Sequence, residues 1–324
     1  MREQILAMLR QSGDEYLSGE VMSARLGISR AAVWKHMQAL QAEGFEIDAV
    51  TRLGYRLKSN SNVLRAPILD PLLKTKTLGR STTFLQSTAS TNGVAKQLAA
   101  QGCPHGTLVV AEEQTAGRGR RGRTWLNTPG KDLCMSVVLR PRLEAQHAPR
   151  FTLATALGVY NLVASLGLVP SIKWPNDVLI AGKKICGILL EMEGTIESLD
   201  SLIVGFGLNV NTLEFPSEIQ SFATSLCAQA GREWNRAEIM AQLLNELEPL
   251  FDACAQEDSY SALLTQYRAH CATIGQVVDI AGIAGDLHGV VEDIDDTGRL
   301  LLRTTDGVLQ TVAAGDVTLR PSAN

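Results

Sequence analysis

The sequence predicts an α+β fold divided into several domains, and three observations support this prediction. A chain of 324 residues exceeds the usual length of one domain. Residues 1–60 contain helical patterns that end in two short strands, and residues 65–270 alternate strand-like with helical runs. After residue 273 the chain has short strand-like runs separated by turns. We therefore expect three domains, at residues 1–62, 66–270 and 273–321.

The composition is typical of soluble globular domains, because 45% of the residues are hydrophobic and 20% are charged. The formal net charge is only −4, so any contact with nucleic acid requires a local basic patch. The six cysteines are scattered without a C-x-x-C pair, which argues against a disulfide framework or a zinc site. Free thiols, with neither a signal peptide nor a long apolar run, predict a cytoplasmic protein that does not enter a membrane.

Residues 1–60 contain three short helical patterns followed by a hairpin. Ser18 is a good N-cap for the second pattern, and Gly27 can adopt the positive φ of the tight turn that ends it. Ser29 then caps a third helix, and two short strands surround a turn that contains Gly54. Helix, turn, helix and a two-stranded wing together are typical of a winged helix-turn-helix domain.

The third helix of this domain is the element expected to contact DNA. Basic, aromatic and histidine side chains on its surface can meet phosphates and base edges in a major groove. The candidate DNA-binding residues are Ser29, Arg30, Ala31, Trp34, Lys35, His36 and, on the wing, Arg52, with Arg56 beside it. Basic and acidic residues are almost equally numerous in this segment, so a small helical domain that docks a protein is the alternative.

Strand-like and helical runs alternate in the middle of the chain, as in a mixed α/β domain. The segment 148–167 is apolar on nearly all sides, which predicts a buried helix, and residues 237–270 are expected to be helical. The expected strands are TLVVAEEQ at 107–114, DLCMSVVLR at 132–140, the residues around IKWP at 172–175, KKICGILLEM at 183–192 and SLIVGFGLNV at 201–210.

Four arginines and three glycines occur together in GRGRRGR at residues 117–123, here called the arginine loop, directly after a predicted strand. The segment contains G-x-G-x-x-G, but TWLNTPGKDL, which follows it, forms no amphipathic helix whose N-terminus could hold a pyrophosphate. We expect instead a mobile loop whose glycines give the backbone freedom and whose arginines bring charge to phosphate groups as it closes. The alternative is a solvated basic loop or a nucleic-acid patch.

The sequence KWPND at 173–177 is the second segment that a hydrophobic core does not require. The proline stiffens a bend, Asn176 and Asp177 could orient a metal-bound or ribose group, and Trp174 offers a flat apolar wall. In the alternative interpretation the asparagine and aspartate only stabilise a turn.

The third such segment is KKICGIL at 183–189, a predicted strand that begins with two cations. Strand alternation sends Lys183 and Lys184 to opposite faces, so that one of them could point into a site. The alternative is a pair of edge-strand lysines that discourage pairing with another chain.

The last part of the chain is predicted to form a small β-barrel of the SH3 type. The expected strands are QVVDIAG at 276–282, HGVVEDID at 288–295, RLLLRTT at 299–305 and VLQTVAA at 308–314. The segments 295–298 and 306–307 are strong turn signals between them.

Taken in their order along the chain, five segments closely resemble those of the biotin–protein ligase family. They are Ser90-Thr91-Asn92, Gln114 with the arginine loop, KWPND, KKICG at 183–187 and GFGLNVN at 205–211. The resemblance covers about residues 80–210 and, more weakly, the chain to its end. It implies a central domain resembling class II synthetases and an SH3-like domain after it. The winged helix-turn-helix in front matches the bifunctional bacterial subclass, which also represses the biotin operon.

The resemblance implies a reaction in two steps. The carboxylate of biotin attacks the α-phosphorus of ATP, which releases pyrophosphate and forms biotinyl-5′-AMP. A lysine of an acceptor protein then attacks this mixed anhydride, forms an amide and releases AMP. The implied partners are the biotin carboxyl carrier protein of acetyl-CoA carboxylase and operator DNA, the latter bound by a ligand-dependent homodimer.

The resemblance also assigns roles to individual residues. The implied catalytic residues are Lys184, Arg118, Arg120 and Asp177. Those implied to bind biotin are Ser90, Thr91, Asn92, Gln114, Gly117, Arg118, Gly119, Arg120, Lys184 and Gly187. Those implied to bind ATP and Mg²⁺ are Arg120, Arg121, Trp125, Lys173, Asn176, Asp177 and Asn209, with Asp177 and Asn209 as oxygen ligands of the metal. Cations suit this chemistry because two anionic reactants must be brought together.

One stretch departs from the bifunctional pattern. Residues 212–222 read TLEFPSEIQSF, without a tryptophan that could cover an adenine ring. Phe215 or Phe222 is the expected substitute.

Two other functions remain in view. A lipoate-type ligase also forms an adenylate, although the arginine loop together with KWPND favours biotin. A transcription factor could use the central domain only to sense a ligand, although three separate reactive segments argue against it.

Overall fold

The computed structural model of the chain describes residues 1–42, 45–58, 62–194, 199–281, 286–313 and 315–319. It divides into two compact units. One consists of Met1–Leu72 with Asn235–Met240, and the other of Leu73–Trp234 with Ala241–Asn324. The three domain boundaries expected from the sequence stay a prediction.

The first unit begins with the predicted winged helix-turn-helix. Its elements are α1 (Arg2–Gln11), α2 (Gly19–Leu26), α3 (Arg30–Ala42), β1 (Ile47–Val50) and β2 (Gly54–Leu57), followed by α4 (Ala66–Leu69) and the short helix η1 (Asp70–Leu72). The Ser18 hydroxyl accepts a hydrogen bond from the Val21 N–H at 3.1 Å, and the Ser29 hydroxyl accepts one from the Ala32 N–H at 3.2 Å. Gly27 has a φ of 66°, so the turn between α2 and α3 uses the conformation for which glycine is suited.

A single apolar cluster holds this head together. Val33, Met37 and Leu40 of α3 pack against α1, α2 and the first strand of the wing. β1 pairs with β2 in antiparallel register, with Val50 opposite Gly54 at the tip. The exposed side of α3 is left to solvent, as the 3.6-residue period of its apolar side chains predicts.

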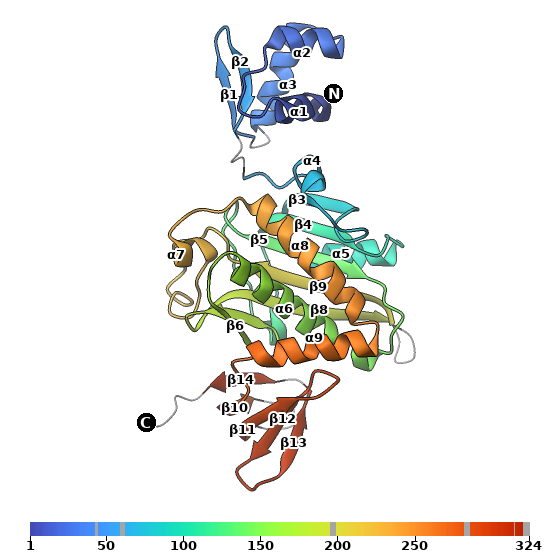
Figure 1. Ribbon diagram of the computed structural model, residues 1–324, viewed down its shortest axis with the longest axis vertical. Helices are drawn as coiled ribbons and strands as arrows, with labels where there is room; N and C mark the ends of the chain where they lie inside the picture. The colour runs from blue at the N-terminus through green and yellow to red at the C-terminus, as the bar shows by residue number, and fades with distance from the viewer. Residues whose placement is uncertain (43–44, 59–61, 195–198, 282–285, 314, 320–324) are drawn as a thin grey trace. The chain divides into compact units, whose positions relative to one another are not determined.

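A mixed sheet forms the framework of the second unit (Figure 1). In spatial order its strands are β3 (Thr82–Thr88), β4 (Thr107–Gln114), β5 (Leu133–Leu139), β9 (Leu199–Leu208), β8 (Lys183–Gly194), β7 (Asp177–Ile180) and β6 (Pro170–Lys173). β3 and β4 are parallel, and the other neighbours are antiparallel. The strands expected from the sequence are confirmed, whereas β3 and β7 are additional.

Helices pack on the sheet and form the hydrophobic core with it. They are α5 (Thr91–Ala100), α6 (Pro149–Ser165), α7 (Leu226–Ala230), α8 (Arg236–Ala253) and α9 (Glu257–His270), with the short helices η2 (Arg120–Gly122) and η3 (Ala145–His147) in loops. α5 packs through Ala95 and Ala99 on Val109, Val138 and Ile203 of the sheet. In Figure 1, α6, α8 and α9 lie in front of the sheet, and α6 is almost wholly buried, as its composition predicts.

The C-terminal strands form an antiparallel sheet of the SH3-like type. In spatial order they are β13 (Leu309–Val312), β12 (Leu300–Thr304), β11 (Asp286–Ile294), β10 (Val277–Ala281) and β14 (Asp316–Leu319). The carboxylate of Asp295 accepts hydrogen bonds from the Thr297 and Arg299 N–H groups, which stabilises the predicted turn between β11 and β12. β14 is additional, and Gly282, Ala314 and residues 320–321, which the predicted strands and domain include, lie outside the described residues.

Trp174 ties the C-terminal sheet to the central sheet of the same unit. Its indole Nε1 donates to the Gly298 carbonyl at 2.9 Å, and its backbone N–H donates to the Thr273 hydroxyl at 3.0 Å. The side chain is 1% exposed. Trp174 therefore serves mainly to join the two sheets, and its expected role as a flat apolar wall of the site stays a prediction.

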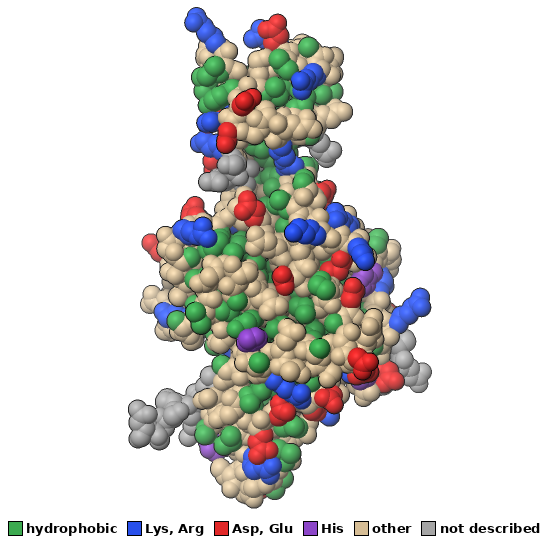
Figure 2. Space-filling model, viewed as in Figure 1, with side chains coloured by type: hydrophobic (Ala, Val, Ile, Leu, Met, Phe, Trp, Pro, Cys, Tyr) green, Lys and Arg blue, Asp and Glu red, His purple; other side chains and the backbone are tan. Residues whose placement is uncertain are grey.

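The surface shows no segregation of charge on the face drawn in Figure 2, where basic and acidic side chains are interspersed over both units. This agrees with the small net charge of −4. Within the part of the chain that the structure describes, no helix combines the length and apolar character needed to cross a membrane.

Candidate active site

A cavity of about 740 Å³ opens over one face of the central sheet, where strands β8 and β9 meet the arginine loop. It is of the size expected for a small-molecule site. Of the residues assigned to biotin or ATP, those that line it are Ser90, Thr91, Asn92, Gln114, Arg118, Gly119, Arg120, Trp125, Lys173, Asn176, Asp177, Lys184, Gly187 and Asn209. Segments that are far apart in the sequence therefore meet in one place.

Two of the assigned residues lie outside the lining. Gly117 is buried where the arginine loop begins, and a Cβ on it would lie 2.4 Å from the Trp125 carbonyl oxygen. The Trp125 N–H donates to the Gly117 carbonyl at 2.9 Å, so the glycine allows the two arms of the loop to approach. Arg121 is exposed and donates from Nη1 to the Ala281 carbonyl in β10 at 2.7 Å.

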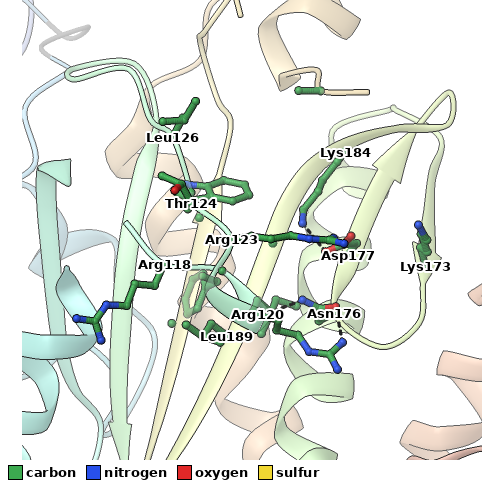
Figure 3. Close-up of a pocket in the computed structure, with 18 of the residues that line it drawn as sticks. Arg118, Arg120, Arg123, Thr124, Leu126, Lys173, Asn176, Asp177, Lys184 and Leu189 are labelled. Carbon is green, nitrogen blue, oxygen red and sulfur yellow. Dashed lines mark hydrogen bonds and ion pairs between the residues drawn. The ribbon is translucent and has the colours of Figure 1, made fainter. Parts of the chain in front are cut away.

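Lys184 is the cation most closely engaged inside the cavity. Its Nζ lies 2.6 Å from Asp177 Oδ1 and 5.6 Å from the centre of the Trp125 ring. Both Lys184 and Asp177 point toward each other in Figure 3. Strand alternation sends the neighbouring Lys183 elsewhere, and its Nζ donates to the Gln220 carbonyl at 3.3 Å. Lys184 therefore faces the cavity and Lys183 does not, in agreement with the alternation of side chains along a strand.

Arg120 and Asn176 form a second polar pair in the cavity (Figure 3). Arg120 Nη1 donates to Asn176 Oδ1 at 3.1 Å, and Asn176 Nδ2 donates to the Ile188 carbonyl at 2.9 Å. The backbone of β8 therefore orients the amide, and the amide orients the guanidinium. Arg118 is exposed and points away from Lys184 and Asp177 in the same view.

Glycines of β8 and β9 form the floor of the cavity. A Cβ on Gly207 would lie 2.2 Å from the Trp125 ring, and one on Gly187 would lie 2.8 Å from it. A Cβ on Gly205 would lie 2.0 Å from Asn92 Oδ1. Within GFGLNVN the sequence assigned a ligand role only to Asn209, although the alternation of glycines within a strand is a signal of close approach.

The sequence also left other lining residues unassigned. Arg123, Thr124, Leu126, Met135, Leu189 and, in the C-terminal sheet, Gly315, Val317 and Thr318 belong to the lining. Arg123 and Leu189 lie in segments that the sequence marked, but no role was assigned to either residue. The positions of the others depend on residues that are close in space and distant in sequence.

The loop that departs from the expected pattern supplies one aromatic ring. Phe222 lines the cavity and is 52% exposed, whereas Phe215 is absent from the lining residues described. The Phe222 carbonyl accepts the Lys184 N–H at 2.7 Å, which holds this end of the loop against β8. Of the two expected substitutes for a tryptophan, Phe222 is the one that lines the cavity, and its contact with an adenine ring stays a prediction.

Asp177 is the only carboxylate among the described residues that line the cavity. Asp177 contributes a carboxylate, which is already paired with Lys184, and Asn209 is buried with its Nδ2 bonded to the Thr224 carbonyl at 2.9 Å. The described residues contain no group of three or more histidine, cysteine, aspartate or glutamate side chains arranged to hold a metal. This donor set fits an ion brought in with nucleotide phosphates better than a metal held by protein alone.

Most of the predicted DNA-binding residues are exposed on the head. Arg30, Lys35 and the wing residue Arg52 are exposed, and Trp34 is 54% exposed, whereas His36 is half-buried. Ser29 and Ala31 are also exposed at the start of α3.

Arg56, beside the wing, has internal partners. Its Nη2 lies 2.9 Å from Asp48 Oδ2, and its guanidinium lies 4.7 Å from the Tyr16 ring centre. The hydrogen bond from Arg56 lowers the pKa of Asp48. Arg56 is therefore used to hold the wing.

Comparisons with known proteins agree along the chain. Residues 1–56 match an HTH domain, residues 84–209 match the biotin/lipoate A/B protein ligase family, and residues 273–320 match the biotin protein ligase C-terminal domain.

Relatives and a solved structure extend the match to the whole chain. The bifunctional ligase/repressor BirA of Bacillus subtilis is 37% identical over 97% of each chain. The biotin–[acetyl-CoA-carboxylase] ligase of Mycobacterium tuberculosis is 36% identical over 78% of this chain and 96% of its own. The structure of biotin protein ligase from Aquifex aeolicus in complex with biotin and ATP has a TM-score of 0.62 and 30% identity, covering 75% of this chain and 100% of that one. With a helix-turn-helix head, a ligase fold and a matching C-terminal domain, the chain belongs to the family of bifunctional biotin protein ligases and repressors.

Proposed function

We propose that this chain is an ATP-dependent biotin–protein ligase that also represses transcription. The observation that carries the catalytic part is the Lys184 ammonium, 2.6 Å from Asp177 in a cavity that Arg120 and Lys173 also line. A cluster of cations in a protein of net charge −4 indicates an anionic ligand. Biotin carboxylate and ATP are two such anions, and the Aquifex aeolicus ligase named above is in complex with biotin and ATP.

Lys184 is assigned the central role in the first step. Its ammonium lies between the biotin carboxylate and the α-phosphate, where it offsets the charge that accumulates as the new bond forms. Asp177 holds the ammonium in this position through their ion pair. Arg120, held by Asn176, and Arg118 bring further positive charge when the arginine loop closes over the ligand. Closure also keeps water from the mixed anhydride.

The remaining assignments concern the two substrates. Ser90, Thr91, Asn92 and Gln114 line the cavity and are the residues proposed to recognise the biotin head group. The glycines at 119 and 187 would let ligand and backbone approach closely. Trp125 and Phe222 supply flat surfaces, and Lys173 supplies charge, for the nucleotide. Asp177 and Asn209 are the residues that would hold Mg²⁺, which would offset the charge of the triphosphate.

The acceptor lysine belongs to the biotin carboxyl carrier protein, and the second partner is operator DNA bound by a homodimer. The assignment of the carrier protein follows from the activity named for the Mycobacterium tuberculosis relative. The assignment of DNA follows from the exposed basic face of α3 and from the repressor relative. A cytoplasmic location stays a prediction.

Pyrophosphate release tests the catalytic proposal directly. The full chain is incubated with ATP and either biotin or lipoate, and then with a biotin carboxyl carrier domain. Biotin alone is expected to support pyrophosphate release and to become attached to the carrier domain. Release with lipoate instead would favour a lipoate-type ligase. No release with either, combined with biotin-dependent DNA binding, would favour a ligand-sensing transcription factor.

Replacing Lys35 with alanine is expected to weaken DNA binding and leave ligation unchanged. Loss of one phosphate contact lowers affinity by about tenfold at moderate salt and reduces the slope of log K against log salt by about 1. Fluorescence anisotropy with an operator selected from random duplexes measures both quantities.

The matched control is Lys76→Ala, an exposed lysine of the second unit. It is expected to bind the operator as the wild type does. An equal loss in both variants would mean that α3 is not the contacting element.

A further inference from the structure

Both the nitrogen and the oxygen of the Asn92 side-chain amide form hydrogen bonds within the protein. Its Nδ2 donates to Glu191 Oε2 at 2.7 Å and to the Leu189 carbonyl at 3.4 Å, while its Oδ1 lies 2.6 Å from the Ser136 hydroxyl. A carboxylate only accepts hydrogen bonds, so Glu191 determines which end of the amide is which. Asn92 is 4% exposed, and both ends of its amide have partners inside the fold.

The orientation of Asn92 determines where the proton of Ser136 goes. Ser136 is 0% exposed on β5 and contacts both Asn92 Oδ1 at 2.6 Å and Thr91 Oγ1 at 2.7 Å. Asn92 Oδ1 cannot donate, so the single hydroxyl proton of Ser136 is donated to it. The Thr91 hydroxyl has two possible acceptors, Ser136 Oγ at 2.7 Å and Gln114 Oε1 at 3.1 Å. Because the Ser136 proton is already donated to Asn92, the shorter contact, with Ser136, takes the proton of Thr91.

The same backbone segment determines the orientation of Gln114. The Thr91 N–H donates to Gln114 Oε1 at 2.8 Å, so the amide oxygen is occupied and Gln114 Nε2 is the end left for the cavity. Thr91 Oγ1, whose proton is donated to Ser136, keeps only acceptor capacity toward a ligand. In the cavity, Thr91 Oγ1 is therefore presented as a hydrogen-bond acceptor and the neighbouring Gln114 Nε2 as a donor.

Glu191, which accepts the hydrogen bond from Asn92, is itself held by an ion pair. Lys96 Nζ lies 2.8 Å from Glu191 Oε1. Burial would raise the pKa of Glu191, but hydrogen bonds from Lys96 and Asn92 outweigh it and lower the pKa, so the carboxylate stays ionised at neutral pH. Gly205 completes the arrangement, because a Cβ there would collide with the Asn92 amide.

We propose that Ser136 and Glu191 are positioning residues that give the head-group site its polarity, with Thr91 presented as an acceptor and Gln114 as a donor. This inference rests on the proposed function. A cyclic urea, which carries both N–H groups and a carbonyl, matches this pair. The dithiolane ring of lipoate has neither group, so the arrangement also selects against it.

A double-mutant cycle on the full-length chain tests the inference, with the dissociation constant of biotin measured by isothermal titration calorimetry. Ser136→Ala is expected to weaken the binding of biotin about tenfold, because Thr91 loses the nearer of its two acceptors and keeps only the longer contact with Gln114 Oε1. Thr91→Val is expected to weaken it by about tenfold or more. The double variant is expected to lie within about twofold of Thr91→Val alone, because Ser136 acts only through the Thr91 hydroxyl.

The matched control is Thr155→Val, which removes another fully buried hydroxyl, bonded to the Phe151 carbonyl within α6. It is expected to leave the dissociation constant within about twofold of the wild type, because its hydroxyl is bonded only within the helix. Should Ser136→Ala fail to fold, Glu191→Ala takes its place in the cycle. Glu191 is half-buried, and its removal frees the Asn92 amide that orients the Ser136 hydroxyl.

The outcomes separate this inference from the proposed function. A wild-type chain that does not bind biotin would overturn both. A wild-type chain that binds biotin, with effects of Ser136→Ala and Thr91→Val that multiply, would overturn the positioning role alone. An equal loss in the Thr155→Val control would also overturn it, because any buried hydroxyl would then have the same effect.

Discussion

Replacing Lys184 with alanine is expected to lower kcat/KM for adenylate formation by about 10²- to 10³-fold. The variant removes the cation that faces both reactants and leaves the carboxylate of Asp177 unpaired beside them. An unpaired anion at this position repels the biotin carboxylate and the phosphates, which adds to the loss. Pyrophosphate release and the yield of biotinyl-5′-AMP measure the effect.

The adjacent lysine provides the matched control. Lys183→Ala removes the same charge from the same strand, but its ammonium contacts the Gln220 carbonyl and not the cavity. The kcat/KM of Lys183→Ala for adenylate formation is expected to stay within about twofold of the wild-type value, because most surface substitutions have small effects. In the absence of biotin and ATP, DNA binding by both variants is expected to equal that of the wild type. Equal ligation by Lys184→Ala and Lys183→Ala would remove Lys184 from its assigned role.

Replacing Arg120 with alanine is expected to make the enzyme release its adenylate about 10- to 100-fold faster, the loss typical of one charge-assisted hydrogen bond. Asn176 holds the Arg120 guanidinium in the cavity, where it can contact the phosphate of the intermediate. The freed mixed anhydride then reacts with lysines of unrelated proteins. Retention of radiolabelled adenylate on gel filtration and biotin transfer to serum albumin measure the two consequences.

Arg142→Ala serves as the control for this experiment, because Arg142 is exposed and is not among the residues that line the cavity. It is expected to retain the intermediate as the wild type does. Undiminished retention by Arg120→Ala would contradict the role of the arginine loop as a cover.

Local patterns in the sequence determined the layout of secondary structure. The apolar period of α3, the caps Ser18 and Ser29 and the glycine turn at Gly27 act within a few residues of one another. The same holds for the buried helix α6 and for the turn at Asp295. Such features can be predicted from the chain alone because their partners are adjacent in sequence.

The elements that escaped prediction are those that depend on distant neighbours. β3 alternates polar and apolar residues weakly and is stabilised by its pairing with β4, while β7 and β14 have only four residues each. α5 begins directly at Thr91, inside a segment that the sequence marked only as a ligand contact.

The site divides in the same way. The sequence marked the arginine loop, KWPND and the lysine pair, because their residue types are unusual for a core. Only the tertiary structure decided that Lys184 faces Asp177, that Arg121 turns to Ala281 and that Ser136 lies beneath Thr91. The physical reason is that a side chain's chemistry is a local property, whereas its partner and the direction of its proton depend on strands and helices brought together by folding.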